Sequence, residues 1–372
     1  MTGSTKRPIS VCFISPKAYP LFEPDADGVI GGAEVDLYML ATELAKDENY
    51  RVSCITADYG QPDTQKYENV TVIKSLDFKK NPIKGAAKIW KAMKIADADV
   101  YMMKTPSPGV PLASAFCKRF NRHFTYRAAS EREFNGVYLS KHPLLGRLFI
   151  RSLRKASLIT VQNQADADNL FSLAKLKAIV IPNGHRIPDL ADTTKQIFLW
   201  VGRSAPVKRP ELFLTLAKEL PGEKFTMICQ PATGDSNYDS LVEKASQIPN
   251  LEFHKEVSFA KIDKFFAKAK FLVNTSDSEG FPNTFVQACK ASTPILSLNV
   301  NPDGFLDEYG CGVCCEGDLD KMAAQVKILA ATRSGEQMGA RGRDYVEKTH
   351  DLAKIIERYK ELFVTLKSNK EK

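Results

Sequence analysis

The stretch FLVNTSDSEGFPNTFVQACKASTPILSL, residues 271–298, has the local features of a strand, a loop, a helix and a second strand. Phe271–Val273 is a short apolar run of the kind that forms a buried strand, and Ile295–Leu298 begins another. Glu279–Pro282 interrupts the run, and Asn283 can act as the N-cap of the helix that follows. A strand–loop–helix–strand unit of this kind is a parallel βαβ crossover, so the stretch predicts a parallel sheet.

The loop of this unit predicts a ligand site. It places the carboxylate of Glu279 just beyond a strand and beside a helix N-terminus, whose free N–H groups attract anions. Gln287, one turn beyond Asn283, can face the same place, and a carboxylate with an amide can bind sugar or ribose hydroxyls. The structural alternative is a solvated loop acid and a surface amide.

The whole chain predicts an α/β fold with two doubly wound domains. At 372 residues it is too long for one typical core, and strand-like and helix-like segments alternate on both sides of a turn-rich linker at 182–194. We place an N-terminal Rossmann-like domain at 1–188 and a C-terminal one at 189–354. Such domains usually bind ligands in a cleft at the carboxyl ends of their strands. The expected strands are residues 9–14, 51–56, 70–74, 99–104, 124–128, 158–162 and 178–182, then 197–201, 225–229, 251–253, 271–273, 295–298 and 312–315.

Composition indicates a cytoplasmic protein. No apolar run has the length of a membrane span, and residues 1–8 lack the apolar core of a secretion signal. The eight cysteines are scattered and lie mostly in apolar runs, which favours reduced buried thiols. Cys311, Cys314 and Cys315 have no second Cys or His pair at zinc spacing, so we expect no metal site.

Positive charge is concentrated in one region. Residues 74–155 hold 18 Lys and Arg against 5 Asp and Glu. Within that region, 79–94 and 141–155 combine basic side chains with apolar ones at helical spacing. We expect peripheral contact of these segments with the inner, anionic face of a membrane; the alternative is ordinary core helices with a solvated basic face. Nucleic-acid binding is not expected, because stacking aromatics do not interleave with the basic residues.

Two further loops follow predicted strands. Gly28-x-x-Gly31-Gly32-Ala33-Glu34 fits neither the P-loop nor the dinucleotide fingerprint, but paired glycines let the backbone approach a ligand closely. A plain turn with a glycine N-cap fits this loop equally well. Val201-Gly202-Arg203 with Lys208 offers two cations suited to phosphate oxygens, and its alternative is a solvated basic loop.

Together the three loops resemble those of the GT-B-fold retaining glycosyltransferases of family 4 (glycosyl transferases group 1). The resemblance covers nearly the whole chain. Its most specific part is Ser276-x-x-Glu279-Gly280-Phe281-Pro282-Asn283 leading into Gln287. It implies two Rossmann-like domains facing across a cleft, the first binding the acceptor and the second a nucleotide sugar. It also implies that the last helix, within 355–372, crosses back onto the N-terminal domain.

The resemblance implies roles for individual residues, with no bound metal or cofactor. Catalytic roles fall to Arg203 and Lys208, which would hold the donor diphosphate, and to Glu279, which would contact the donor sugar. The implied donor-binding residues are Gly31, Gly32, Gly280, Phe281, Asn283 and Gln287. The expected reaction moves a sugar from a UDP- or GDP-sugar to an acceptor hydroxyl with retention, in glycan, polysaccharide or glycolipid biosynthesis.

The chain departs from the family at two places. Gln287 stands where the family has a glutamate that binds the ribose, so the bond would lack charge assistance. No His follows the strand at 124–128; His123 precedes it, and we expect Arg127 or Glu131 to occupy part of that space. Two alternatives stay open: a nucleotide-sugar epimerase or phosphorylase with the same architecture and, given these departures, a catalytically weakened nucleotide-sugar-binding protein of the same fold.

Overall fold

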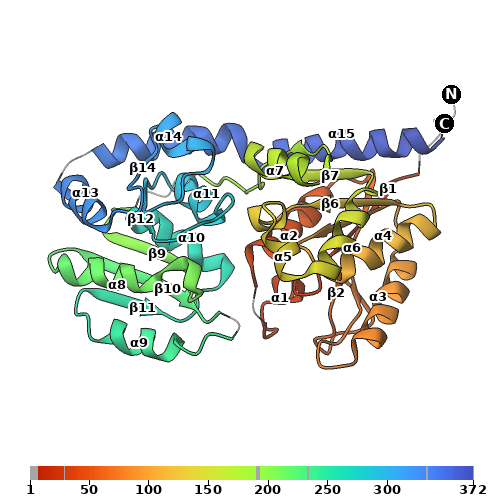
Figure 1. Ribbon diagram of the computed structural model, residues 1–372, viewed down its shortest axis with the longest axis horizontal. Coiled ribbons are helices and arrows are strands. Elements are labelled where there is room, and N and C mark those ends of the chain that lie inside the picture. The colour runs from red at the N-terminus through yellow and green to blue at the C-terminus, as the bar shows by residue number, and fades with distance from the viewer. Residues whose placement is uncertain (1–6, 29, 190–192, 233, 332–333, 372) are drawn as a thin grey trace. The chain divides into compact units, whose positions relative to one another are not determined.

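A computed structural model describes residues 7–371, apart from 29, 190–192, 233 and 332–333. Residues 1–6, in the segment expected to lack a secretion signal, residues 190–192 of the predicted linker and Val29 of the first glycine loop lie outside the described residues. The chain divides into two compact units (Figure 1). The N-terminal unit is Met1–Arg186 with Leu352–Lys372, and the C-terminal unit is Ile187–Asp351. The expected boundaries, 188/189 and 354/355, fall just after these divisions.

The described strands of the N-terminal unit form one sheet. Their order is β3-β4-β2-β1-β5-β6-β7-β8, and the pairs are parallel except β3–β4. The bounds are β1 (Ile9–Ile14), β2 (Tyr50–Thr56), β3 (Thr64–Tyr67), β4 (Val70–Lys74), β5 (Val100–Lys104), β6 (His123–Arg127), β7 (Leu158–Val161) and β8 (Ile179–Val180).

Helices cover both faces of this sheet. On one face, Val11 and Phe13 of β1 pack in a core with α1 (Tyr19–Phe22), α2 (Gly32–Leu44) and α15 (Leu352–Glu371). On the other, Cys12 and Ile14 pack with α3 (Pro82–Ala96), α4 (Gly109–Arg119), α6 (Pro143–Leu153) and α7 (Gln164–Ala174). The short α5 (Val137–Lys141) precedes α6. Side chains alternate along a strand, so one strand supplies both cores.

The C-terminal unit has a parallel sheet of order β11-β10-β9-β12-β13-β14 in the described residues. Its strands are β9 (Ile197–Arg203), β10 (Lys224–Gln230), β11 (Leu251–His254), β12 (Ala269–Asn274), β13 (Ile295–Ser297) and β14 (Gly312–Cys314). Its helices are α8 (Pro210–Glu219), α9 (Tyr238–Ser246), α10 (Phe259–Lys268), α11 (Asn283–Lys290), α12 (Phe305–Glu308), α13 (Leu319–Ala331) and α14 (Ser334–Thr349). Phe198 and Trp200 pack on one face of the sheet and Leu199 on the other.

The predicted α/β fold class, with two doubly wound units, is confirmed. Each expected strand is present; β1 and β4 have the predicted bounds, and the others have shifted ends, as β9 does, which continues to Arg203. The prediction missed β3, an edge strand of polar residues. The last helix, α15, packs in the N-terminal unit against α2 and β1. Within the described residues, no helix is both long enough and apolar enough to cross a bilayer.

Candidate active site

The Lys208 loop, residues 204–209, follows β9 in the C-terminal unit. Arg203 is the last residue of β9 and is exposed, and Lys208 ends a 3-10 turn and is half-buried. Arg209, with a φ of 47°, has the left-handed backbone conformation that costs a residue with a side chain about 1 kcal/mol. Both predicted cations therefore belong to the carboxyl edge of the parallel sheet, where doubly wound folds bind ligands.

The Glu279 loop, residues 275–282, follows β12, the strand that pairs with β9. The Glu279 carboxylate forms an ion pair with the Lys208 ammonium. It also accepts hydrogen bonds from Asn274 Nδ2 (2.9 Å) and Ser276 Oγ (2.7 Å). The structure thus brings together two of the predicted site residues. Sequence reasoning missed the part that Asn274 and Ser276 have in holding the carboxylate.

The start of α11 differs in detail from the prediction. Pro282, not Asn283, occupies the N-cap, with φ −65° and ψ 128°, and Asn283 is the first helical residue. A proline fits here because its fixed φ suits the approach to a helix and the cap needs no N–H. Gln287 lies on the next turn and is half-buried. The side chain of Phe281 packs against an aromatic cluster, with its ring centroid 5.0 Å from that of His350.

Two cations hold the carboxyl end of α11. Lys195 Nζ donates to the carbonyl of Ala291 (2.7 Å), and Arg343 Nη1 donates to the carbonyl of Lys290 (2.6 Å). Cations at this end complement the helix dipole, and the positive end of the dipole lies at the Glu279 loop. Burial lowers the pKa of Lys195 to about 8.

Gly31 and Gly32 belong to the N-terminal unit. Gly31 is the N-cap of α2, and its N–H donates to Glu34 Oε2 at 3.0 Å. A Cβ on Gly31 would lie 2.7 Å from that oxygen, so a side chain here would displace the Glu34 carboxylate, which lies at the end of a flexible side chain. The geometry suits the glycine-capped turn, and Gly32, which opens the helix, is exposed. This arrangement does not test the prediction that Gly31 and Gly32 contact the donor.

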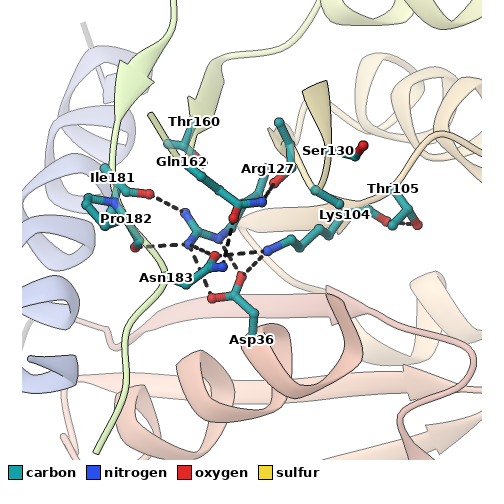
Figure 2. Close-up of polar contacts among 12 residues, drawn as sticks. Asp36, Lys104, Thr105, Arg127, Ser130, Thr160, Gln162, Ile181, Pro182 and Asn183 are labelled. Carbon is teal, nitrogen blue, oxygen red and sulfur yellow. Dashed lines mark hydrogen bonds and ion pairs between the residues drawn. The ribbon is translucent and has the colours of Figure 1, made fainter. Parts of the chain in front are cut away.

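A buried charged cluster lies at the carboxyl edge of the N-terminal sheet (Figure 2). Arg127, the last residue of β6, is fully buried and donates to both carboxylate oxygens of Asp36 on α2, at 2.5 and 3.2 Å. Lys104, the last residue of β5, donates to Asp36 at 2.7 Å, and Asn183 Oδ1 accepts from both cations. Arg127 also donates to the hydroxyl of Tyr359 on α15 at 2.8 Å.

The protonation states follow from this burial. Burial alone would raise the pKa of Asp36, but Arg127 and Lys104 hold it well below its usual range. Burial outweighs the attraction of Asp36 and lowers the pKa of Lys104 to about 8. Burial also raises the pKa of nearby Glu133 to about 7, against the lowering effect of hydrogen bonds from Tyr126 and the Ala129 amide.

The expectation that Arg127 takes the place of the family's histidine is wrong. Its guanidinium has no exposed surface and is bonded to protein groups, because the strand ends inside the cluster and not at the surface. Glu131, the other candidate, is half-buried at the start of a 3-10 turn, Glu131–Glu133. His123 is the first residue of β6, at the opposite end of the strand from Arg127, and its Nδ1 lies 3.0 Å from Ser157 Oγ.

Comparison with known proteins identifies the family. The family model for glycosyl transferases group 1 matches residues 185–344, and that for glycosyltransferase family 4 matches residues 30–186. The chain belongs to the family 4 glycosyltransferases. This confirms the resemblance carried by the three loops.

Among curated relatives of this glycosyltransferase is the D-inositol 3-phosphate glycosyltransferase of Mycobacterium marinum, 25% identical over 149 residues. That match spans 38% of this chain and 32% of the relative, about a third of its length.

Solved structures share the GT-B fold. Sucrose-phosphate synthase from Thermosynechococcus elongatus has a TM-score of 0.78 and 17% identity, over 97% of this chain and 100% of that one. Anabaena HepE, solved with UDP, has a TM-score of 0.71 and 15% identity, over 96% and 100%. At such identities the likeness concerns the fold alone.

Proposed function

We propose that this family 4 glycosyltransferase moves a sugar from a nucleoside diphosphate donor, a UDP- or GDP-sugar, to an acceptor hydroxyl with retention of anomeric configuration. The observation that carries the proposal is the Lys208–Glu279 pair beside the start of α11, in the loops that follow two neighbouring strands at one sheet edge. A cation, an acid and a helix N-terminus in one place suit a diphosphate joined to a sugar.

The hard step is departure of the diphosphate while positive charge develops on the sugar. Arg203, Lys208 and the N–H groups at the start of α11 would stabilise the developing negative charge electrostatically. Glu279 would accept hydrogen bonds from sugar hydroxyls, and Gln287 from the ribose. The bond from the anomeric carbon to the diphosphate oxygen breaks and a bond to the acceptor oxygen forms on the same face. The donor phosphate takes the acceptor's proton.

A panel of UDP- and GDP-sugars tests this assignment. The expected result is slow release of nucleotide from one of them, followed by transfer when an acceptor is supplied. Arg203→Ala and Lys208→Ala should each lower turnover by more than about tenfold. The matched control is Lys218→Ala, an exposed lysine in the last turn of α8. Near-normal turnover in both loop variants would remove the diphosphate assignment, and interconversion of the sugar would indicate an epimerase.

We expect the reaction to proceed without a bound metal. The support is that Arg203 and Lys208 supply two positive charges at the place where the diphosphate would lie. Turnover should therefore persist in excess EDTA. Loss of turnover with EDTA and its recovery with Mg²⁺ or Mn²⁺ would contradict this part of the proposal.

The partner of the N-terminal unit is proposed to be an anionic membrane carrying a lipid-linked acceptor. Large apolar side chains stand out from the two basic segments: Ile83 is 80% exposed and Leu144 is 75% exposed. Phe78, beside the first segment, is 57% exposed. Lysines and arginines around inserted apolar side chains suit the headgroup region of an anionic leaflet. This surface would keep the protein on the cytoplasmic face of the membrane.

Vesicle sedimentation tests the membrane contact. The protein should pellet with vesicles that contain phosphatidylserine or phosphatidylglycerol, and less so as salt rises, because screening weakens surface attraction. Ile83→Ser and Leu144→Ser should reduce pelleting. The control is Ile328→Ser, which changes an apolar residue, 53% exposed, in the C-terminal unit. Equal pelleting with neutral and anionic vesicles would refute the contact.

A further inference from the structure

A buried side-chain relay joins the two site loops of the C-terminal unit. Trp200, in β9, donates from Nε1 to Thr275 Oγ1 at 2.9 Å, and Thr275 Oγ1 donates to the Lys208 carbonyl at 2.7 Å. The directions are fixed, because an indole N–H can only donate and a carbonyl can only accept. Thr275 is completely buried and Trp200 is 2% exposed, so water does not replace either bond.

The residues on each side of Thr275 hold the other half of the ion pair. Asn274 and Ser276 both donate to Glu279 Oε1, while Thr275 between them donates to the main chain of Lys208. Three consecutive side chains therefore hold both members of the Lys208–Glu279 ion pair in place through hydrogen bonds.

The backbone conformation of the Lys208 loop has to be stabilised by hydrogen bonds to neighbouring residues. Its turn ends at Arg209, whose left-handed backbone is unfavourable for a residue with a side chain and persists only where its surroundings hold it. Two other links exist: the Asp277 N–H donates to the Val207 carbonyl at 2.9 Å, and Arg209 pairs with Asp277 at 3.1 Å. The Arg209–Asp277 pair is exposed and therefore contributes little. The Thr275 hydroxyl makes the buried side-chain link.

We propose that Thr275 is a positioning residue for the donor site: its hydroxyl fixes the Lys208 loop so that the Lys208 ammonium lies where a nucleoside diphosphate binds. The inference rests on the proposed function, since it assigns Lys208 to the diphosphate. Without the hydroxyl, the Lys208 carbonyl and the Trp200 N–H both lose their partner in a dry site, and the turn relaxes. Thr275 itself touches no substrate.

Isothermal titration of the full chain with UDP and with GDP tests the proposal. Thr275→Val keeps the shape and removes the hydroxyl, and it should weaken nucleotide binding by about tenfold. Thr275→Ser keeps the hydroxyl and should bind within about threefold of the wild type. Thr226→Val is the matched control, because Thr226 is equally buried in β10 of the same sheet, and it should also remain within about threefold.

A second variant covers the case in which Thr275→Val does not fold. Trp200→Phe keeps an aromatic ring and removes the donor of the relay, so it should weaken nucleotide binding by about threefold. Wild-type affinity in Thr275→Val, or equal losses in Thr275→Val and Thr275→Ser, would overturn the inference. Failure of the wild-type protein to bind either nucleotide would overturn the proposed function instead. Tenfold weakening in Thr275→Val together with a normal Thr275→Ser supports both.

Discussion

Replacing Arg127 by methionine should destabilise the N-terminal unit strongly. Methionine fills similar apolar volume but removes every bond of the guanidinium. Those bonds run to the Asp36 carboxylate, to Asn183 Oδ1 (2.8 Å), and to the carbonyls of Ile181 (3.0 Å) and Pro182 (3.1 Å) (Figure 2). One further bond runs to the Tyr359 hydroxyl (2.8 Å). The variant therefore leaves a buried carboxylate with one cation fewer and two carbonyls without this donor.

The expected loss follows from that geometry. Breaking a buried ion pair by removing one partner costs about 3–5 kcal/mol, so we expect about 4 kcal/mol of unfolding free energy to be lost. Most of this is the cost of leaving Asp36 charged in a dry site. The double variant Asp36→Asn, Arg127→Met should therefore be more stable than the sum of the single losses by at least about 2 kcal/mol. Tyr359→Phe, which removes one neutral hydroxyl, should cost only about 1 kcal/mol.

Urea unfolding can follow the N-terminal unit alone. The chain has two tryptophans, Trp90 in the N-terminal unit and Trp200 in the C-terminal unit. In a Trp200→Phe background, Trp90 fluorescence reports the unit that contains Arg127. A loss below about 1 kcal/mol for Arg127→Met, or additive losses in the double variant, would refute the ion-pair reasoning.

Three other predictions concern single side chains. Burial raises the pKa of Glu133 from 4.5 to about 7, so the folded state binds the proton more tightly than the unfolded state does. The contribution of this proton to the free energy of unfolding is therefore fully present below pH 4.5 and is lost as the pH rises through 7. Relative to Glu133→Gln, the wild type should lose about 3 kcal/mol across that window in urea unfolding; a constant difference would contradict this. Gln287→Glu should tighten UDP or GDP binding several-fold in calorimetry, by roughly 1 kcal/mol, through a charge-assisted ribose bond; unchanged or weaker affinity would remove the ribose role. Lys195→Met should destabilise the C-terminal unit by about 1 kcal/mol, seen by Trp200 fluorescence in a Trp90→Phe background, because it uncaps the end of α11; unchanged stability would argue against the cap.

The sequence predicts the strands well because most of them are apolar runs. β1, for example, is Ile-Ser-Val-Cys-Phe-Ile and is buried along its whole length. The sequence did not predict β3, Thr64–Tyr67, because most of its residues are polar. Among the described strands it pairs with β4 alone, at the edge of the sheet. Thr64 and Lys66 are exposed, and Gln65 and Tyr67 are half-buried, so this edge strand contains no apolar run.

The residues of the candidate active site can be predicted from the sequence only where they belong to a recognisable motif. Lys208 and Glu279 were predicted from motif resemblance, and the structure pairs them. The role of Thr275 depends on an indole 75 residues away and a carbonyl 67 residues away, separations that no local pattern encodes. Arg127 was misjudged for the same reason, because Asp36 and Tyr359 lie 91 and 232 residues from it.

The bond between Arg127 and Tyr359 also sets an order of events during synthesis. The ribosome delivers Tyr359 232 residues after Arg127, which at 5–20 residues per second is a delay of about 10–50 s. In that interval the C-terminal unit, continuous from Ile187 to Asp351, can complete its fold. The N-terminal sheet meanwhile exposes the apolar face that Leu352, Ile355 and Tyr359 will cover. The first half of this chain is thus the last to finish, and until then part of its apolar core is uncovered.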